Sequence, residues 1–264
     1  MLLAIDVGNS NTVLAVFDGP ELRHTWRLRT ESRATADELA LQLRALLSTL
    51  PGAPAPDPTA GLTGIVACST VPSLLRTLKR TFRGWFPDVP AMTIESGTDV
   101  GVRLDVLNPP EVGTDRIVNT RAAFELFGGP CVVVDLGTST NFDVVGPDGA
   151  YLGGAIAPGI ELSLEALTTR AAQLSRVSLQ APPSAIGRNT AECLQSGMIY
   201  GAAGQVDGIV ERIRIAVGGS LEAVVATGGL APLVVGEASS ITDHRPDLTL
   251  LGLRLAYEHL SAAV

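Results

Sequence analysis

The spacing of hydrophobic and polar positions changes several times along the chain, and these changes predict an α/β protein. Apolar runs at residues 2–7 and 12–18 predict two strands around a tight turn, with a third strand near residues 23–28. Thr35 and Glu38 then form a capping-box pattern, after which leucines recur at helical spacing. The chain therefore begins as three strands followed by a helix.

The same order of elements returns later in the chain. A buried strand from residue 64, an amphipathic helix from Ser73 and a strand near residues 91–95 complete the first half. The second half is predicted to contain a helix at 115–127, strands at 131–136, at 140–145 and from 150, helices at 161–174 and 190–217, a strand from 223 and a helix at 248–262. We interpret this as an internal duplication, with mixed sheets, flanking helices and two lobes at residues 1–114 and 115–264.

Composition and charge narrow the class of protein. Apolar residues make up 46% of the 264 positions, which allows a sizeable core, and the proline-rich stretch from Pro51 predicts a loop. A net charge of −8 argues against non-specific binding to nucleic acid or anionic membranes. No secretion signal or 18-residue apolar stretch is present, so we expect neither export nor a membrane span. Cys68, Cys131 and Cys193 form no CxxC pair, which favours reduced, mostly buried thiols in a cytosolic protein.

Two acidic turns are the strongest candidates for chemistry. "DVGNSNT" begins at Asp6 and "DLGTSTN" begins at Asp135, and each follows an apolar strand. Backbone N–H groups in such turns can bind phosphate oxygens, and a cation such as Mg²⁺ would offset the repulsion between phosphate and carboxylate. Either turn alone could be an ordinary hairpin. Two copies in two similar halves favour a shared polyphosphate, and "VATGG" from Val225 adds a possible adenosine site beside the alternative of a simple turn.

"GTDR" at residues 113–116 opens a predicted helix and offers a second kind of chemistry. Asp115 could be a plain helix cap and Arg116 a surface charge. Alternatively, Asp115 accepts a proton from an attacking hydroxyl, while Arg116 and the helix N-terminus hold an anionic substrate group. Phosphoryl transfer requires little beyond such positioning and charge stabilisation.

The long helix predicted from Thr190, which we expect to act as its cap, carries a row of glycines. Gly197, Gly201, Gly204 and Gly208 fall on one face. Each glycine costs about 1 kcal/mol of helix propensity relative to alanine. The row therefore predicts close packing of another backbone, from the same subunit or from a second one.

Motifs spread over nearly the whole chain resemble those of type III pantothenate kinases, which are members of the acetate kinase/sugar kinase/Hsp70/actin superfamily. The matching stretches are "DVGNSNT" from Asp6, "NPPEVGTDRIVN" from Asn108, "VVVDLGTSTNFDVV" from Val132, "YLGGAIAPGI" from Tyr151, "IGRNTAECLQSGMIYG" from Ile186, "VDGIVERI" from Val206 and "VVATGGLAPL" from Val224. The resemblance implies a duplicated ribonuclease H-like, or actin-like ATPase, fold.

By the same resemblance, the chain is expected to phosphorylate pantothenate to 4'-phosphopantothenate with ATP and Mg²⁺, the first step of coenzyme A biosynthesis. It would be a cytoplasmic homodimer that also needs a monovalent cation, K⁺ or NH₄⁺. Asp115 would be the general base, Asp135 would bind the monovalent cation and Asp6 would hold Mg²⁺ through ATP. The implied ATP contacts are Asp6, Val7, Gly8, Asn9, Ser10, Asn11, Thr12, Val13 and Thr138. The implied pantothenate contacts are Gly113, Thr114, Asp115, Arg116 and, from a facing subunit, Thr190.

Two departures from the family pattern keep alternatives open. Val106 stands where the family usually has an aromatic residue, which removes a possible substrate contact. Ser139 and Asn141 replace the usual alanine and threonine of the second turn. The alternatives are a non-catalytic ATP-binding regulatory accessory factor, another small-molecule kinase of this fold such as a sugar kinase, and a phosphohydrolase.

Overall fold

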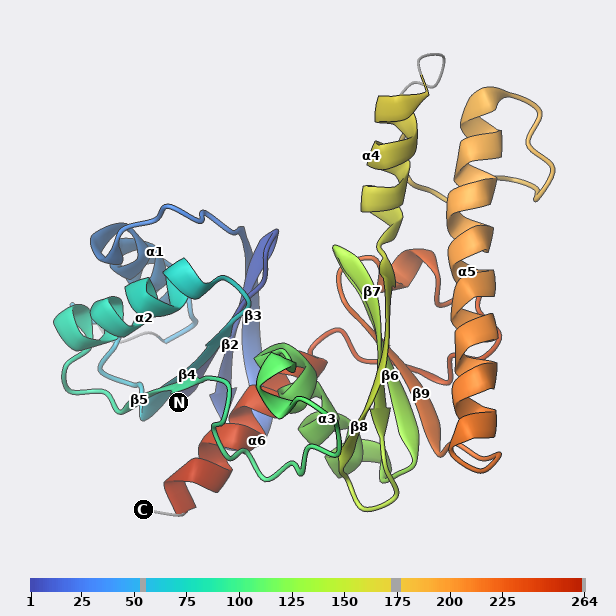
Figure 1. Cartoon of the computed structure of the whole chain (residues 1–264). Helices are drawn as coiled ribbons and strands as arrows, with labels where there is room; N and C mark the ends of the chain where they lie inside the picture. Colours follow the sequence, from blue (N-terminus) through green and yellow to red (C-terminus); the bar gives the residue numbers. More distant parts are fainter. Residues whose placement is uncertain (53–55, 172–176, 263–264) are drawn as a thin grey trace. The chain divides into compact units, whose positions relative to one another are not determined.

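The structure, a computed structural model, describes residues 1–52, 56–171 and 177–262. The chain divides into two compact units (Figure 1). The first unit contains Met1–Gly101, Asn108–Ala122 and Thr249–Val264, and the second contains Val102–Leu107 and Ala123–Leu248. The last helix therefore returns the chain to the first unit.

The first unit is built on a five-stranded mixed sheet in the order β3-β2-β1-β4-β5. Its strands are β1 (Leu2–Val7), β2 (Asn11–Asp18), β3 (Glu21–Arg29), β4 (Gly64–Ser69) and β5 (Ala91–Ile94). The first three strands are antiparallel neighbours, whereas β4 and β5 run parallel to β1. The predicted strand–turn–strand beginning and the buried strand from residue 64 are confirmed.

Helices α1 (Ala36–Ser48) and α2 (Pro72–Trp85) provide the main core of this unit. Leucines of both helices pack with Leu3, Ile5 and Val7 of β1, which are alternate residues on one side of the strand. The predicted capping box is present, because Thr35 and Glu38 cap the start of α1 reciprocally. This packing leaves the intervening residue Asp6 on the opposite side of the sheet.

The opposite side of the first sheet lies against α6 (Leu248–Ala262). The Tyr257 hydroxyl donates to the carbonyl of Thr63 at 3.4 Å, and the Arg254 guanidinium lies over the ring of Phe17, 5.9 Å from its centre. Gly252 closely approaches α3 (Thr114–Phe127), since an added Cβ would lie 2.1 Å from the Val118 carbonyl oxygen. The start of α3 and α6 are thus packed in the same unit as Asp6.

The second unit repeats the sheet order, with β10-β9-β6-β7-β8. Its strands are β6 (Cys131–Leu136), β7 (Ser139–Val145), β8 (Tyr151–Pro158), β9 (Ala223–Thr227) and β10 (Asp243–His244). Again the first three strands are antiparallel neighbours, and β9 and β10 run parallel to β6 or to each other. The matching topology confirms the predicted duplication, although the short strand β10 was not predicted.

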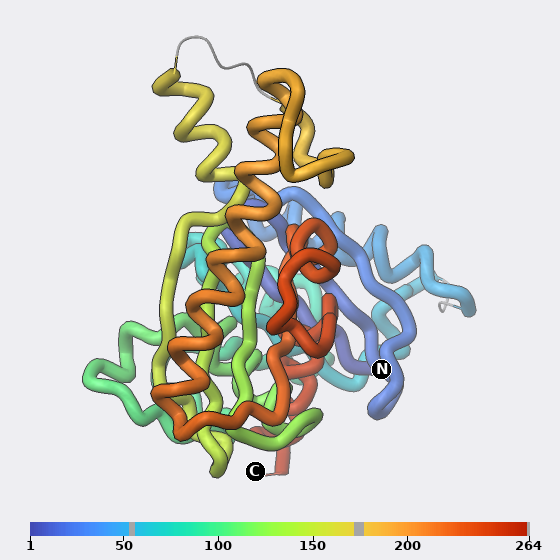
Figure 2. Tube along the Cα trace, turned by 90° about the vertical axis from the view of Figure 1, so that its right-hand side faces the viewer, coloured from blue at the N-terminus to red at the C-terminus, as the bar shows by residue number. Residues whose placement is uncertain are grey.

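The core of the second unit lies between its sheet and α5 (Thr190–Ala216), which runs along the strands with α4 (Ile160–Arg170) at one end (Figure 2). Val132, Val134 and Leu136 pack into this core, which leaves Asp135 on the other side of the sheet. In both units, therefore, the acidic residue near the end of the first strand points away from the main helix-covered core.

Three predicted details of the helices and loops differ from the structure or lie partly outside the described residues. Thr190 is not the cap of the long helix but its first residue, because the Asn189 side chain accepts a hydrogen bond from the N–H of Glu192 at 2.9 Å. The end of the predicted helix at 161–174 lies partly outside the described residues, since α4 ends at Arg170 and residues 172–176 are not described. Residues 53–55 of the predicted proline-rich loop also lie outside them.

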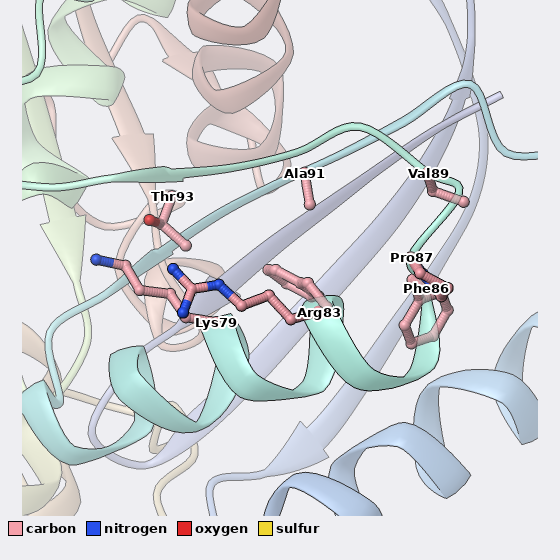
Figure 3. A pocket seen from close by; sticks show the side chains of 8 residues that line it. Lys79, Arg83, Phe86, Pro87, Val89, Ala91 and Thr93 are labelled. Atoms are coloured by element: carbon pink, nitrogen blue, oxygen red, sulfur yellow. The ribbon is translucent and has the colours of Figure 1, made fainter.

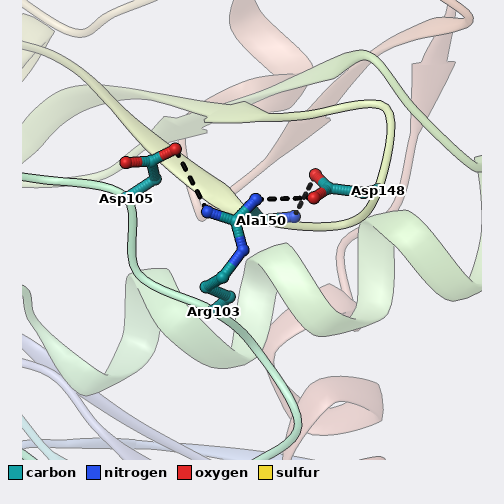
Figure 4. Close-up of polar contacts among 4 residues, drawn as sticks. All are labelled: Arg103, Asp105, Asp148 and Ala150. Atoms are coloured by element: carbon teal, nitrogen blue, oxygen red, sulfur yellow. Dashed lines mark hydrogen bonds and ion pairs between the residues drawn. The ribbon is translucent and has the colours of Figure 1, made fainter.

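Arg103 fixes the short segment that precedes the "NPPEVGTDR" motif. Its guanidinium pairs with Asp105 at 3.1 Å and with Asp148, while Asp148 also accepts from the N–H of Ala150 at 3.3 Å (Figure 4). Backbone hydrogen bonds join residues 103 and 105 to Tyr151. Val106 follows directly, and its side chain lies against Gly153.

Candidate active site

The first acidic turn is held by hydrogen bonds to its own backbone. The N–H of Gly8 donates to the carbonyl of Asn11 at 3.0 Å, and the Thr30 hydroxyl donates to the carbonyl of Gly8 at 2.7 Å. Thr12 is buried and its hydroxyl lies 3.0 Å from that of Thr30. Asn9, Ser10 and Asn11 remain exposed. The turn is therefore held in place by Thr12 and Thr30, and its exposed polar residues lie at the surface.

Asp6 lies in a small polar cluster on the sheet face that carries α3. Parallel pairing of β1 with β4 sets Asp6 opposite Cys68, and the thiol donates to Asp6 Oδ1 at 3.4 Å. Burial raises the pKa of the Cys68 thiol, and the side chain of Thr114, the first residue of α3, is near enough to oppose this shift. The charge of Asp115 acts on both Asp6 and Cys68. The structure thus brings the first turn and the start of the "GTDR" helix together within the first unit.

Burial and like charge perturb the titration of this cluster. Burial, followed by the neighbouring negative charge of Asp115, raises the pKa of Asp6 to about 7, against the smaller opposing effects of Cys68 and Arg27. Burial also raises the pKa of Asp115, and its hydrogen bond with the Arg116 backbone and the charge of Arg116 oppose this shift. Two carboxyl groups that resist ionisation together are a common feature of sites that bind cations or transfer protons.

At the start of α3, the Asp115 carboxyl group lies close to Gly113, two residues earlier in the chain. A Cβ atom on Gly113 would lie 2.4 Å from Asp115 Oδ1, so only glycine leaves space for this carboxylate position. The carbonyl of Gly113 accepts hydrogen bonds from the N–H groups of Arg116 and Ile117 at 3.1 and 3.2 Å. Gly113, Thr114, Asp115 and Arg116 are all half-buried and therefore partly accessible.

The second acidic turn repeats the first in outline. The N–H of Gly137 donates to the carbonyl of Ser139 at 2.9 Å, as Gly8 does in the first turn. Thr138 is exposed, and its carbonyl accepts from the N–H of Gly159 at 3.1 Å. The Ser139 hydroxyl donates to the Asn141 side chain at 3.1 Å. Ser139 and Asn141, the two residues that depart from the family pattern, are therefore hydrogen-bonded to each other.

Gly228 lies directly against the second turn. Its φ is +90°, and an added Cβ would lie 2.4 Å from Asp135 Oδ1 and 2.5 Å from the carbonyl oxygen of Leu136. Glycine is needed here both for the backbone conformation and for the space beside the carboxylate. The predicted role of the "ATGG" stretch in adenosine binding stays a prediction, because this contact already accounts for Gly228.

The predicted site residues thus form two groups. The residues at 6–13 and 113–116 lie in the first unit, whereas Asp135, Thr138 and Thr190 lie in the second. Thr190 is exposed at the start of α5.

A separate pocket of about 400 Å³ lies between α2 and β5 and contains none of the predicted site residues (Figure 3). Lys79 and Arg83 extend over its apolar floor, and Lys79 pairs with Glu95 at 2.6 Å. Behind the first turn, Val7 and Thr12 line a space of only about 30 Å³, which is too small for a nucleotide. Neither hollow competes with the acidic turns as the candidate site.

Sequence reasoning missed two polar residues near this site. Cys68 was expected to be an ordinary buried thiol, and no local motif marks its contact with Asp6. Asn119, one helical turn after Asp115, is completely buried, and neither atom of its side-chain amide has a hydrogen-bond partner in the structure. A buried amide without partners is uncommon and usually has a functional or solvent-related explanation.

The carboxylates of the candidate site suit a metal ion that binds as part of a metal–nucleotide complex. Within the described ranges, no group of three or more His, Cys, Asp or Glu side chains could hold a metal ion by itself. Mg²⁺ bound to a nucleotide needs only one or two protein carboxylates, because phosphates and water complete its coordination. Asp6 can serve as such a carboxylate.

In the same described ranges, no helix is both long and apolar enough to cross a membrane.

Comparison with known proteins decides the family. A family model described as type III pantothenate kinase matches residues 2–212. The chain belongs to the type III pantothenate kinase family. The type III pantothenate kinase of Salinispora arenicola is 53% identical, with 98% of this chain and 99% of the relative covered. That of Streptomyces coelicolor is 51% identical, with 98% of each covered.

Solved structures independently support the fold of this type III pantothenate kinase family member. Component A of the (R)-2-hydroxyglutaryl-CoA dehydratase of Acidaminococcus fermentans gives a TM-score of 0.58 at 14% identity, over 100% of this chain and 99% of that chain. The inorganic polyphosphate/ATP-glucomannokinase of Arthrobacter sp. strain KM gives 0.51 at 15% identity, over 99% and 98%. At such low identity the likeness concerns the fold alone, and it confirms the expected actin-like ATPase fold.

Proposed function

We propose that this protein is a pantothenate kinase, which transfers the γ-phosphoryl group of ATP to pantothenate and forms 4'-phosphopantothenate for coenzyme A biosynthesis. Full-length similarity to type III pantothenate kinases supports this substrate. The observation in the structure that carries the proposal is the cluster of Asp6, Cys68, Thr114 and Asp115. In this cluster, the Asp115 carboxylate at the N-terminus of α3 lies near the first acidic turn, which resembles turns that bind phosphate.

Asp6 to Val13 and Thr138 are proposed to bind ATP. The exposed polar residues of the first turn supply donors for phosphate oxygens, and the turn itself is already fixed by Thr30. Asp6 would hold Mg²⁺ through ATP. Such a cation would offset phosphate charge and would favour the ionised form of the Asp6 carboxyl group, whose pKa burial and Asp115 raise.

Asp115 is proposed as the general base. The primary hydroxyl oxygen of pantothenate forms a bond to the γ-phosphorus, the bond from that phosphorus to the β–γ bridging oxygen breaks, and ADP leaves. Asp115 accepts the hydroxyl proton as the new bond forms. A raised pKa makes Asp115 a better proton acceptor than an ordinary aspartate.

Gly113, Thr114 and Arg116 are proposed to bind pantothenate together with Asp115. Pantothenate carries a carboxylate, and the guanidinium of Arg116 together with the N-terminal end of α3 suits an anionic group. Arg116 is partly accessible at this helix end. An anionic acceptor favours pantothenate over a neutral sugar, which was the alternative substrate class.

Asp135 is proposed to bind the monovalent cation, K⁺ or NH₄⁺. It is half-buried, and its Oδ1 atom lies against Gly228, where an added Cβ would be 2.4 Å away. A weakly hydrated monovalent ion can be held by one carboxylate and nearby carbonyl oxygens, and the Leu136 carbonyl lies against the same glycine. The ion would reduce the negative charge around the phosphates.

We further propose a cytoplasmic homodimer in which Thr190 of one subunit contacts pantothenate bound to the other. The glycine row supports a second subunit, because a Cβ built on Gly197, Gly201 or Gly204 meets no atom of the described chain within 4 Å. Buried residues on α5 face the core instead. The row is therefore open for close approach by another backbone.

The deciding experiment measures ADP formation with ATP, Mg²⁺ and a panel of acceptors, and identifies the product by mass spectrometry. Pantothenate should be phosphorylated in K⁺ or NH₄⁺ and much less in Na⁺. Phosphorylation of a sugar alone would support a different kinase, and phosphate release without an acceptor would support hydrolysis. ATP binding without turnover would support the regulatory alternative.

A further inference from the structure

Cys68 stands at the centre of the cluster and has no part in the mechanism above. It is fully buried on β4, so solvent reagents do not reach it in the folded protein. Its thiol nevertheless donates a hydrogen bond to Asp6 Oδ1 at 3.4 Å, and the side chain of Thr114 lies near enough to act on its titration. A buried thiol that only filled the core would not need a polar partner.

These two contacts join segments that are far apart in the sequence. Asp6 is the penultimate residue of β1, and Thr114 begins α3, the helix that carries Asp115. Cys68 lies between them because parallel pairing aligns it with Asp6. The thiol therefore links the proposed ATP-binding turn to the helix end with the proposed base.

The internal duplication places a comparable pair of residues in the second unit. Pairing of β6 with β9 aligns Asp135 with Thr227, just as β1 and β4 align Asp6 with Cys68. Thr227 is also buried. In both units, a small side chain able to form hydrogen bonds stands beside the acidic residue on the neighbouring parallel strand.

We propose that Cys68 is a positioning residue, whose thiol holds the Asp6 carboxylate and the start of α3 in the arrangement needed for phosphoryl transfer. This inference rests on the proposed function. It assigns no chemical step to the sulfur atom. Its role is to fix the relative positions of Asp6 and Asp115, both of which belong to the first unit.

Cys131 offers a matched control. It is also a fully buried cysteine on a central strand, but burial alone raises the pKa of its thiol, to about 12. Substitutions at Cys131 therefore report the cost of altering a buried thiol in this protein. Effects seen only at Cys68 report its polar contacts.

The test uses valine and threonine, which have nearly the same shape but differ in one hydroxyl group. Cys68→Thr, Cys68→Val, Cys131→Thr and Cys131→Val are compared by melting temperature, kcat, KM for pantothenate and Kd for MgATP. Cys68→Val is expected to lower kcat by about 10- to 100-fold, the scale of a small misplacement of reacting groups. Cys68→Thr should regain most of this loss, because its hydroxyl can donate to Asp6 as the thiol does.

The control pair should behave differently. Cys131→Thr should be no more active than Cys131→Val and should melt at a lower temperature, because its hydroxyl is buried without the partners present at Cys68. If either variant at Cys68 fails to fold, Cys68→Ser and Cys68→Ala provide a smaller pair with the same difference. Equal kcat within the Cys68 pair, or the same pattern at both cysteines, would overturn the positioning role.

Failure of the proposed function would be recognised separately. If the unaltered protein forms no ADP with pantothenate, the substrate assignment is wrong. Calorimetric binding of MgATP still tests Cys68 in that case, since Cys68→Val should bind more weakly than Cys68→Thr. Equal affinities would then contradict the inference.

Discussion

Gly113 and Asp115 are so close that a Cβ atom on residue 113 would lie 2.4 Å from Asp115 Oδ1. Gly113→Ala should therefore displace the carboxylate without disturbing the core, because residue 113 is only half-buried. We expect kcat to fall by about 10- to 100-fold, as for other small displacements of a reacting group. Steady-state kinetics and circular dichroism would check this, and full activity of the variant would show that the observed carboxylate position is not needed.

Asp6 should make the stability of the ligand-free protein depend on pH near neutrality. The pKa of Asp6 in the folded protein, about 7, lies above its ordinary value of 3.8, so between these pH values the folded state keeps a proton that the unfolded state has lost. The free energy of unfolding should fall as pH rises through this range, by at most about 4 kcal/mol, and become level above it. Asp115 contributes in the same direction, because its pKa is also raised.

Asp6→Asn separates these contributions. Urea unfolding at pH 5 and pH 8 should show a smaller loss of stability in the variant than in the unaltered protein, together with loss of kinase activity. The pKa values of Glu38 and Asp57 are lowered, so these groups titrate below the window and do not confuse the comparison. Identical pH dependence in both proteins would contradict the raised pKa of Asp6.

Gly228 and Gly218 form a matched pair for testing Asp135. Both have positive φ, +90° and +103°, but only a Cβ on Gly228 would meet Asp135, since nothing lies within 4 Å of one on Gly218. Alanine should cost about 1 kcal/mol or more of stability at either position because of the backbone conformation. Only Gly228→Ala should also weaken activation by K⁺, measured as kcat against K⁺ concentration. Equal K⁺ responses would argue against Asp135 as the cation ligand.

Gly201 tests the proposed dimer. The described chain leaves open space around it, so Gly201→Leu should produce no clash within one subunit. If a second backbone packs against the glycine row, the variant should shift from dimer to monomer in light scattering, with a fold unchanged by circular dichroism. Gly84→Leu, at an exposed helical glycine of α2 where an added Cβ also meets nothing within 4 Å, serves as the control away from the glycine row. A dimer that persists with Gly201→Leu would place the interface elsewhere.

Much of the fold could be predicted from the sequence, because its signals are local. Alternating and continuous apolar runs located the strands, the capping box at Thr35 located α1, and the repeated order of elements revealed the duplication. The cap of α5 was predicted at Thr190 instead of Asn189, since both are good capping residues and adjacent in sequence. Strand β10 was missed because it has only two residues.

The candidate site was only partly predictable. Asp6 and Asp135 stand out as acidic residues that interrupt apolar strands, and "GTDR" stands out as a helix start. The contact of Cys68 with Asp6 depends on the register of two strands 62 residues apart, which no local pattern specifies. The raised pKa of Asp6 depends likewise on burial and on Asp115, which are properties of the folded chain.

The most direct test of the account is the turnover of Asp115→Asn, measured as pantothenate-dependent ADP formation beside the unaltered protein. The amide keeps the size of the carboxyl group but cannot accept the hydroxyl proton. We predict that kcat falls by about 10²- to 10⁴-fold, the usual contribution of a general base, with the melting temperature retained. Near-full turnover of Asp115→Asn with pantothenate would contradict the account.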